Sequence, residues 1–238
     1  YKSVEGFPCF ATLDDLPSIP EHVIFAISDQ RIEEALDDII ALGIPACTIF
    51  SALIIPNDSL PNLKQRIETK AQNAGLLVAG ANGMGFYNIR DRVLAGGFDT
   101  RHHPIPGNVS LISQSGAGMS GIVDCERRIQ FNFAVSSGYE LTVSMEDYLD
   151  YALDLPETRV VGLFLETSRH PEKLIMTCGH LFARVKAVQI FKPGPGEIVK
   201  IVGGGAGGGG QAAAARAQNG ARRRRGAAAA AAARRRAR

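Results

Sequence analysis

Residues 22–50 of the chain read HVIFAISDQRIEEALDDIIALGIPACTIF, and this stretch decides the fold class. Residues 22–27 form a short apolar run rich in β-forming side chains, which predicts a buried strand. A helix capped by Ser28 or Asp29 should follow, because apolar residues then recur at helical spacing until Gly43. The last five residues of the stretch predict a second strand.

The same alternation continues toward the C-terminus. Residues 59–74 predict a second helix that Gly75 ends, and residues 76–79 predict a third strand. Strands that alternate with helices in this way indicate a parallel sheet with right-handed crossovers. Residues 90–106 contain two prolines and two glycines and are predicted to be an irregular linker.

A second α/β unit follows the linker. Ser144 and Asp147 have the spacing of a capping box that opens one of its helices. The almost wholly apolar run at 160–165 is typical of a central parallel strand. The predicted strands cover residues 109–112, 131–135, 160–165 and 187–191, and the predicted helices cover residues 116–128, 144–155 and 171–184.

The charge of the chain is divided unevenly along its length. The formal net charge is +2, but nine of the 26 Lys and Arg and none of the 24 Asp and Glu lie in residues 201–238. Residues 1–200 therefore have a net charge of −7, which argues against nucleic-acid binding by this part.

The C-terminal tail has the composition of a disordered, low-complexity segment. Gly, Ala and Arg make up 33 of residues 201–238, so this stretch has too few large apolar side chains to form a core. One interpretation is a basic arm that binds nucleic acid or another anionic surface. The other is out-of-frame translation of GC-rich DNA, and the abrupt change in composition favours it.

Residues 113–118 (SQSGAG) lie between a predicted strand and a predicted helix. Free backbone N–H groups at a helix start attract phosphate, and small residues let an anion approach closely. The alternative is an ordinary tight turn with Ser115 as N-cap. The residues alone leave both interpretations open.

Two further segments occupy places where open α/β sheets bind ligands. Residues 80–85 (GANGMG) follow the third strand, and Glu166 ends the apolar strand at 160–165. A carboxylate at that edge could orient a histidine or hold a cation. A plain loop and a solvated strand-end glutamate are the alternatives.

Other chemistry finds little support in the sequence. The four cysteines lack a C-x-x-C pair, and the adjacent His102 and His103 have no acidic or cysteine partner at ligand spacing, so no metal site is predicted. The chain has neither a run of 18 apolar residues nor a secretory signal, so we expect a cytoplasmic protein without a membrane span.

Five segments, in this order, resemble the nucleoside-diphosphate-forming acyl-CoA synthetases, the acetate–CoA ligase family. The likeness is to their CoA-binding half, which is similar to the α subunit of succinyl-CoA synthetase. The five segments are GANGMGFYN at 80–88, NVSLISQSG at 108–116, FAVSSGYE at 133–140, VVGLFLE at 160–166 and KAVQIFKPGPGE at 186–197.

The resemblance implies a fold of two domains. Residues 1–90 would form a truncated Rossmann-like CoA-binding domain, whose first strand and glycine-rich loop would lie before Tyr1. Residues 91–106 would link it to a flavodoxin-like ligase domain at 107–197. Residues 198–238 would be the low-complexity tail.

The resemblance also implies a chemistry. A phosphorylated histidine would pass its phosphoryl group to a carboxylic acid, and the thiol of CoA would capture the acyl phosphate. The helix that starts at Gly116 would face the phosphohistidine, and Glu166, the catalytic residue, would fix the tautomer of the histidine. Ser120 would lie near the substrate. The implied phosphate-binding residues are Ser113, Ser115, Gly116 and Ala117, and the implied CoA-binding residues are Phe50, Ser51, Ala52 and Asn82.

By the same resemblance the chain is incomplete. The active histidine should follow the Lys-Pro loop, but no histidine occurs after His180. ATP and Mg²⁺ would enter only with a nucleotide-binding half, an ATP-grasp domain or subunit. We therefore expect either part of an acid–thiol ligase, with a small carboxylate or acyl-CoA as its ligand beside CoA, or a non-catalytic module that binds CoA or acyl-CoA.

Overall fold

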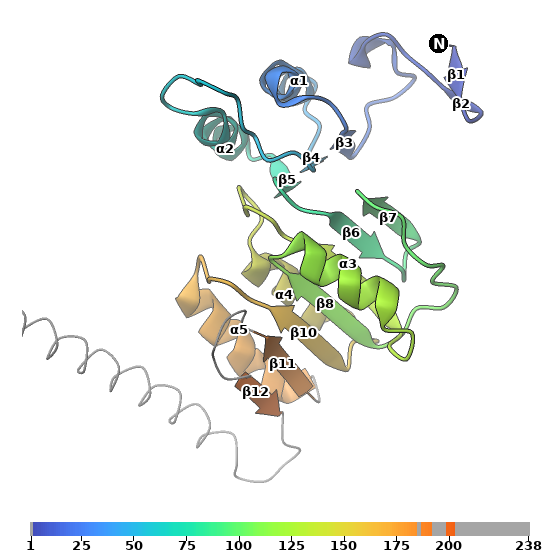
Figure 1. Cartoon of the computed structure of the whole chain (residues 1–238), viewed down its shortest axis with the longest axis vertical. Coiled ribbons are helices and arrows are strands. Elements are labelled where there is room, and N and C mark those ends of the chain that lie inside the picture. The colour runs from blue at the N-terminus through green and yellow to red at the C-terminus, as the bar shows by residue number, and fades with distance from the viewer. Residues whose placement is uncertain (1, 185–186, 192–198, 203–238) are drawn as a thin grey trace, which may run out of the picture.

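The structure is a computed structural model, and it describes residues 2–184, 187–191 and 199–202. Figure 1 shows a small parallel sheet with two helices, joined to a larger sheet that has helices on both faces. The α/β class predicted from the sequence is confirmed. In the described part of the chain, no helix is long and apolar enough to cross a membrane.

The first sheet has three parallel strands in the order β3-β4-β5, with bounds Val23–Phe25, Ala46–Ile49 and Leu77–Gly80. Helices α1 (Asp29–Ala41) and α2 (Leu63–Ala74) connect them. Their apolar faces form one buried cluster with the sheet, which includes Ile32, Leu36, Ile49, Ile67 and Val78.

A short N-terminal region precedes this sheet. Strands β1 (Ser3–Val4) and β2 (Phe7–Pro8) form an antiparallel pair, and the 3-10 helix η1 (Leu13–Asp15) follows them. The residues of both strands are exposed, so this region adds little to the buried core.

The second sheet has seven strands in the order β12-β11-β10-β8-β9-β6-β7. The central strands β8, β9, β10 and β11 run parallel, whereas β6, β7 and β12 pair antiparallel. The strands are β6 (Gly85–Asn88), β7 (Val93–Gly96), β8 (Val109–Ser113), β9 (Phe131–Ser136), β10 (Val160–Phe164), β11 (Ala187–Phe191) and β12 (Val199–Val202).

Helix α3 (Gly116–Cys125) covers one face of this sheet, and α4 (Met145–Asp154) and α5 (Pro171–Arg184) lie on the other (Figure 1). Successive side chains of a strand point to opposite faces of the sheet, so the buried residues form one cluster on each face. Leu111 packs with Met119 and Val123 of α3, whereas its neighbour Ile112 packs with Leu149 of α4.

Three details differ from the sequence prediction. Helix α2 starts at Leu63 rather than at residue 59, because Asn62 accepts a hydrogen bond from the Gln65 amide and caps the helix there. The predicted irregular linker at 90–106 contains β7, and β6 before it was not predicted. The first residues of the predicted tail form β12, because Val199–Val202 has the β-branched composition of a strand.

The register aligns the carboxyl ends of several strands. Phe164 pairs with Ser113, Ser113 with Ser136, and Ser136 with Gly85. The loops that follow β8, β9 and β10 therefore emerge side by side, at the edge where α/β sheets place ligands.

Candidate functional site

The start of α3 forms the turn that the sequence predicted. Ser115 is the N-cap, and its Oγ accepts a hydrogen bond from the Gly118 amide at 3.1 Å. The Ser113 Oγ donates to the Ser115 carbonyl at 2.6 Å, which fixes the strand end against the turn. Gly116 and Ala117 lie in the first helical turn, where amide groups have no partner within the helix.

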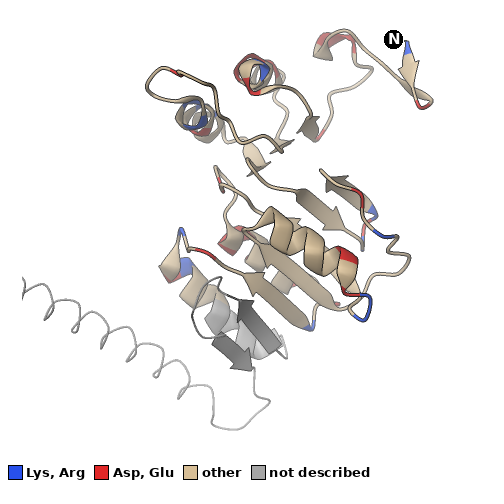
Figure 2. Cartoon of the chain, viewed as in Figure 1, with Lys and Arg blue, Asp and Glu red and all other residues tan. Residues whose placement is uncertain are grey.

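Helix α3 carries no basic residue that could attract an anion. Its ten residues include no Lys or Arg, so its ribbon has no blue segment in Figure 2. Any attraction for phosphate at its start would come from the amide groups and the helix dipole. At the other end, Arg101 donates to the carbonyls of Val123, Glu126 and Ile129.

Ser120 lies one turn further along α3. Its hydroxyl donates to the carbonyl of Ala117 at 3.3 Å, and the side chain is partly exposed. It therefore lies in the first half of α3, one turn from the predicted phosphate turn at 113–118.

Glu166 follows β10, and its side chain is exposed. In the described part of the chain, no donor contacts its carboxylate. Its backbone, in contrast, is fixed, because the Glu166 amide donates to the Gln114 Oε1 at 2.7 Å. Gln114 is the residue between Ser113 and Ser115, so the predicted catalytic carboxylate and the predicted phosphate turn are joined directly.

Glu140 lies behind Gln114 and is buried, with 7% of its surface exposed. Its Oε1 accepts hydrogen bonds from the Gln114 Nε2 at 2.9 Å and the Ser137 Oγ at 2.7 Å. Burial raises the pKa of Glu140, and the charge of Glu146 adds to this; the hydrogen bonds from Gln114 and Ser137 and the charge of Arg169 act in the opposite direction.

The loop after β5 contacts the loop after β9 through backbone atoms. The Tyr139 amide donates to the Ala81 carbonyl at 2.7 Å. A Cβ at Gly83 would lie 2.7 Å from the Ser136 carbonyl oxygen, so the two loops approach as closely as they do because residue 83 has no side chain. The motifs at 80–88 and 133–140 thus meet in space.

The predicted CoA-binding segment connects to the same row of loops. The Asn82 amide donates to the Ser51 carbonyl at 2.8 Å. Phe50 extends toward the second sheet, where a Cβ at Gly97 would lie 3.3 Å from its ring. Ser51 and Ala52 are half-buried, and Asn82 is exposed. Among the described residues, this segment reaches the phosphate turn only through the loops at 80–84 and 136–140.

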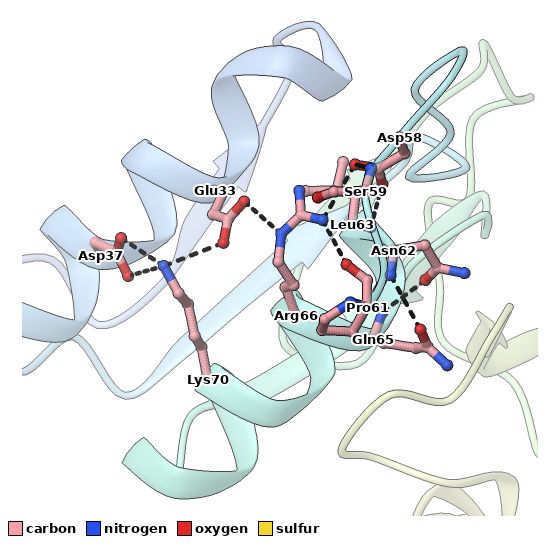
Figure 3. A network of polar contacts seen from close by, with 10 residues as sticks. All are labelled: Glu33, Asp37, Asp58, Ser59, Pro61, Asn62, Leu63, Gln65, Arg66 and Lys70. Atoms are coloured by element: carbon pink, nitrogen blue, oxygen red, sulfur yellow. Dashed lines mark hydrogen bonds and ion pairs between the residues drawn. The ribbon is translucent and has the colours of Figure 1, made fainter.

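Ion pairs anchor the loop that follows this segment, as Figure 3 shows. Arg66 of α2 donates to Glu33 of α1 at 2.9 Å, to Asp58 of the loop at 3.1 Å and to the Pro61 carbonyl at 2.7 Å. The backbone hydrogen bond from Leu63 and the pairing with Arg66 lower the pKa of Asp58. The loop is therefore fixed to both helices of the first unit.

A cavity of about 560 Å³ adjoins Glu140 at the junction of the two units. It lies between α2 and residues 139–144, and Lys64, Tyr139 and Arg169 are among the residues that line it. The Lys64 Nζ lies 4.2 Å from the centroid of the Tyr139 ring.

The histidines that the sequence singled out lie outside the row of loops described above. Among the residues that the structure describes, no group of three or more His, Cys, Asp or Glu is placed to hold a metal ion. His102 and His103 lie between β7 and β8. The Lys-Pro loop at 192–197 and the tail beyond residue 202 lie outside the described residues.

Two residues that the sequence analysis did not select stand at the centre of this arrangement. In the sequence, Gln114 is one residue of the turn at 113–118, and Glu140 ends the segment at 133–140. A polar residue inside a strand-to-helix turn and a glutamate that ends a glycine-containing loop were the available signals. Neither signal showed that the two side chains contact each other.

Family models match both parts of the chain. The succinyl-CoA ligase like flavodoxin domain matches residues 106–236, and a CoA binding domain matches residues 1–88.

Known proteins resemble the chain over most of its length. The acetate–CoA ligase [ADP-forming] of Methanocaldococcus jannaschii is 24% identical over 204 residues, which are 84% of this chain and 28% of the relative. The α subunit of acetate–CoA ligase [ADP-forming] II from Pyrococcus furiosus is 23% identical over 200 residues, which are 82% of this chain and 43% of the relative.

A solved structure shares the fold. The dinucleotide forming acetyl-coenzyme A synthetase 1 of Ca. Korarchaeum cryptofilum, in complex with phosphate and ADP, superposes with a TM-score of 0.70 at 22% identity. The match covers 82% of this chain and 42% of that one. The chain thus spans less than half the length of each of these proteins.

Proposed function

The chain belongs to the family of succinyl-CoA ligase like flavodoxin domains, and on that premise we propose that it is the CoA-binding portion of an acyl-CoA synthetase that forms a nucleoside diphosphate. The overall reaction would convert a carboxylic acid, CoA and a nucleoside triphosphate into acyl-CoA, nucleoside diphosphate and phosphate.

The proposed reaction has three transfers. A histidine nitrogen attacks the terminal phosphate of the nucleotide, and the nucleoside diphosphate leaves. The carboxylate then takes the phosphoryl group from the histidine and becomes an acyl phosphate. The thiolate of CoA finally attacks the acyl carbon, and inorganic phosphate leaves. The names of the relatives, which include ADP-forming ligases, support a nucleotide of the adenosine series.

The observation that carries this proposal is the row of hydrogen bonds across five strand ends. It runs from Ser51 to Asn82, from Ala81 to Tyr139, and from Glu140 through Gln114 to Glu166. Every predicted site segment that the structure describes is part of this row or flanks it. A phosphoryl group passed between a histidine and an acyl group needs such neighbouring sites on one edge.

Within this row we assign roles as part of the proposal. Ser113, Ser115, Gly116 and Ala117 would form the phosphate turn, and the amides at the start of α3 would hold the phosphate. Glu166 would accept a hydrogen bond from the histidine nitrogen that is not phosphorylated.

The other predicted site residues would contact CoA or the acyl substrate. Phe50, Ser51, Ala52 and Asn82 would contact CoA. Ser120 would face the acyl substrate.

The domain division is proposed with the function. Residues 1–90 would bind CoA and residues 107–197 would carry the phosphoryl chemistry, joined by residues 91–106. Strands β6 and β7 lie at this junction, since they pair with the second sheet.

We infer that the chain needs further parts for the full reaction. Its five histidines all lie at or before residue 180, whereas the resemblance places the active histidine after the Lys-Pro loop. ATP and Mg²⁺ would be supplied by an ATP-grasp domain or subunit.

Two experiments test the proposal. The chain alone should bind CoA in isothermal titration but should not form acyl-CoA from ATP, acetate and CoA. Addition of an ATP-grasp half and of the missing histidine segment should restore acyl-CoA formation, which a coupled thiol assay detects. A chain that binds no CoA would contradict the proposal.

A non-catalytic CoA or acyl-CoA binding module is the second candidate. The absence of a histidine after His180 in the sequence favours it. Such a module should bind acyl-CoA as tightly as CoA and should gain no activity when the missing parts are supplied. The restoration experiment therefore separates the two candidates.

A further inference from the structure

The segment that follows β10, residues 166–170, is held by side chains from two other regions of the second unit. We propose that Gln114 is a positioning residue that fixes the backbone of Glu166, and that Glu140 and Glu146 complete the same clamp. The clamp is a property of the geometry. Its purpose, the aiming of the Glu166 carboxylate at a histidine, rests on the proposed function.

The amide of Gln114 uses its full hydrogen-bonding capacity. Its Oε1 accepts from the Glu166 amide at 2.7 Å and from the Thr167 amide at 2.8 Å. Its Nε2 donates to the Thr167 carbonyl at 2.6 Å and to the Glu140 Oε1 at 2.9 Å. A primary amide offers two donors and one oxygen with two lone pairs, so each is occupied.

This pattern also fixes the orientation of the amide. A flipped Gln114 would place its NH₂ group against the two backbone N–H groups of Glu166 and Thr167, and its oxygen against two other oxygens. Leucine lacks all four contacts, and asparagine is one methylene too short to reach all of them. The position therefore requires an amide of the length of glutamine.

Glu140 holds the amide from the other side. Its Oε1 accepts from both Gln114 and Ser137, and it is almost fully buried. Its Oε2 has no hydrogen bond and lies 3.7 Å from the Arg169 Nε. Arg169 also donates to the Tyr139 carbonyl at 3.1 Å. The loop after β9 thus holds both Gln114 and the clamped segment.

Glu146 of α4 holds the far end of the segment. It is fully buried, and its Oε1 accepts from the Ser168 hydroxyl and from the His170 amide at 3.3 Å. The backbone between residues 166 and 170 is therefore fixed at both ends, while the Glu166 side chain is exposed and its carboxylate has no protein partner in the described part of the chain. A carboxylate that must meet a histidine at one angle needs such a fixed base, because its own side chain rotates freely.

Amide hydrogen exchange of the intact 238-residue chain tests the clamp directly. Q114L should raise the exchange rates of the Glu166 and Thr167 amides by about tenfold or more, because both lose their acceptor. The matched control Q72L removes only a 3.4 Å contact on α2 and should leave these rates unchanged. Equal protection in Q114L and in the unmodified chain would overturn the clamp. If Q114L does not fold, Q114N gives the same comparison.

Conservative replacement of Glu140 tests the hydrogen bond between Gln114 and Glu140. E140Q keeps an oxygen that accepts from Gln114 and Ser137, so protection of the Glu166 and Thr167 amides should persist. E140L removes that acceptor and should reduce protection. If both variants reduce it equally, the charge of Glu140 rather than its hydrogen bonds matters, and the proposed role of Glu140 is overturned.

A turnover assay tests whether the clamp serves to aim the Glu166 carboxylate. The assay uses the chain assembled with a nucleotide-binding half and the histidine segment. Q114L should lower kcat by about tenfold or more and leave the Kd for CoA within about twofold, because Gln114 does not contact the CoA segment. An equal loss of kcat and of CoA affinity would show that Gln114 has a merely structural role, and it would overturn the positioning role. If the unmodified assembly makes no acyl-CoA, the proposed function fails, whereas the exchange result still decides the clamp.

Discussion

Gly138 lies so close to Ala81 that a Cβ at residue 138 would come within 2.1 Å of the Ala81 carbonyl oxygen. The φ angle of Gly138 is +61°, a conformation that residues with side chains rarely adopt. The next amide, of Tyr139, donates to the same carbonyl. The two units of the chain therefore touch here through backbone alone.

Replacement of Gly138 by alanine should destabilise the protein by about 3 kcal/mol, because the new methyl group meets a carbonyl that is already hydrogen-bonded. Urea unfolding followed by circular dichroism measures the loss. Gly121 is the matched control, since a Cβ there meets nothing within 4 Å. Gly121→Ala lies within α3 and should be neutral or stabilising by up to about 1 kcal/mol. Equal effects of the two substitutions would contradict the close contact.

Local patterns made most of the fold predictable. The apolar run before Ser28, the helical spacing up to Gly43 and the capping box at Ser144 each specify an element by contacts between near neighbours in the sequence. Strands β6 and β7 are only four residues long and were not predicted. Strand β6 is specified by antiparallel pairing with β9, more than 40 residues away, and β7 pairs with β6 at the edge of the sheet. Pairing of this kind leaves no periodic signal in a short stretch.

The candidate site was predictable only in part, for the same reason. Ser115 and Glu166 stand at the ends of predicted strands, where the topology alone places ligand sites. Gln114 and Glu140 acquire their importance from a contact between two loops, across 26 residues of sequence. Nothing in either loop, taken alone, specifies that contact.

Arg101 stabilises the end of α3 that is opposite the phosphate turn. Its guanidinium donates to the carbonyl of Val123 in the last turn of the helix, and to the carbonyls of Glu126 and Ile129 in the turn that follows. Arg101→Ala should therefore cost about 2 kcal/mol in the free energy of unfolding, since several hydrogen bonds from a charged donor are lost. Thermal and urea unfolding measure it. Arg127→Ala, at an exposed arginine nearby, should change stability by less than about 0.5 kcal/mol. A similar loss in both variants would rule out the capping role.

Glu140 should make the stability of the protein depend on pH. Burial raises its pKa in the folded state, so the folded protein holds a proton that the unfolded chain releases at lower pH. Its contribution is therefore most favourable below the ordinary carboxyl pKa, near 4.5, and is lost as pH rises through the raised value. The groups that act on its charge are Gln114, Ser137, Glu146 and Arg169, and its own charge adds to burial in raising the pKa of the nearby Tyr148.

Glu140→Gln removes this titration and keeps the shape of the side chain. The stability of the variant relative to the unmodified protein should therefore improve as pH rises above the ordinary carboxyl pKa, near 4.5. Urea midpoints at a series of pH values measure the difference. Glu172→Gln, at an exposed glutamate of α5, should give a difference that stays flat. A flat difference for Glu140→Gln as well would show that Glu140 is ionised in the folded protein throughout this range.

Arg66 should matter for CoA binding without contact to CoA. It fixes the loop after the predicted CoA segment by binding Asp58 and the Pro61 carbonyl, while it also binds Glu33 of α1 (Figure 3). Arg66→Met should free this loop, so limited proteolysis within residues 53–62 should become several-fold faster and the affinity for CoA should fall. Arg31→Met, at an exposed arginine of α1, controls for the loss of charge. Faster cleavage with unchanged CoA affinity would show that the loop lies outside the CoA site. Unchanged cleavage would show that the proline-rich loop is held by its own packing and not by Arg66.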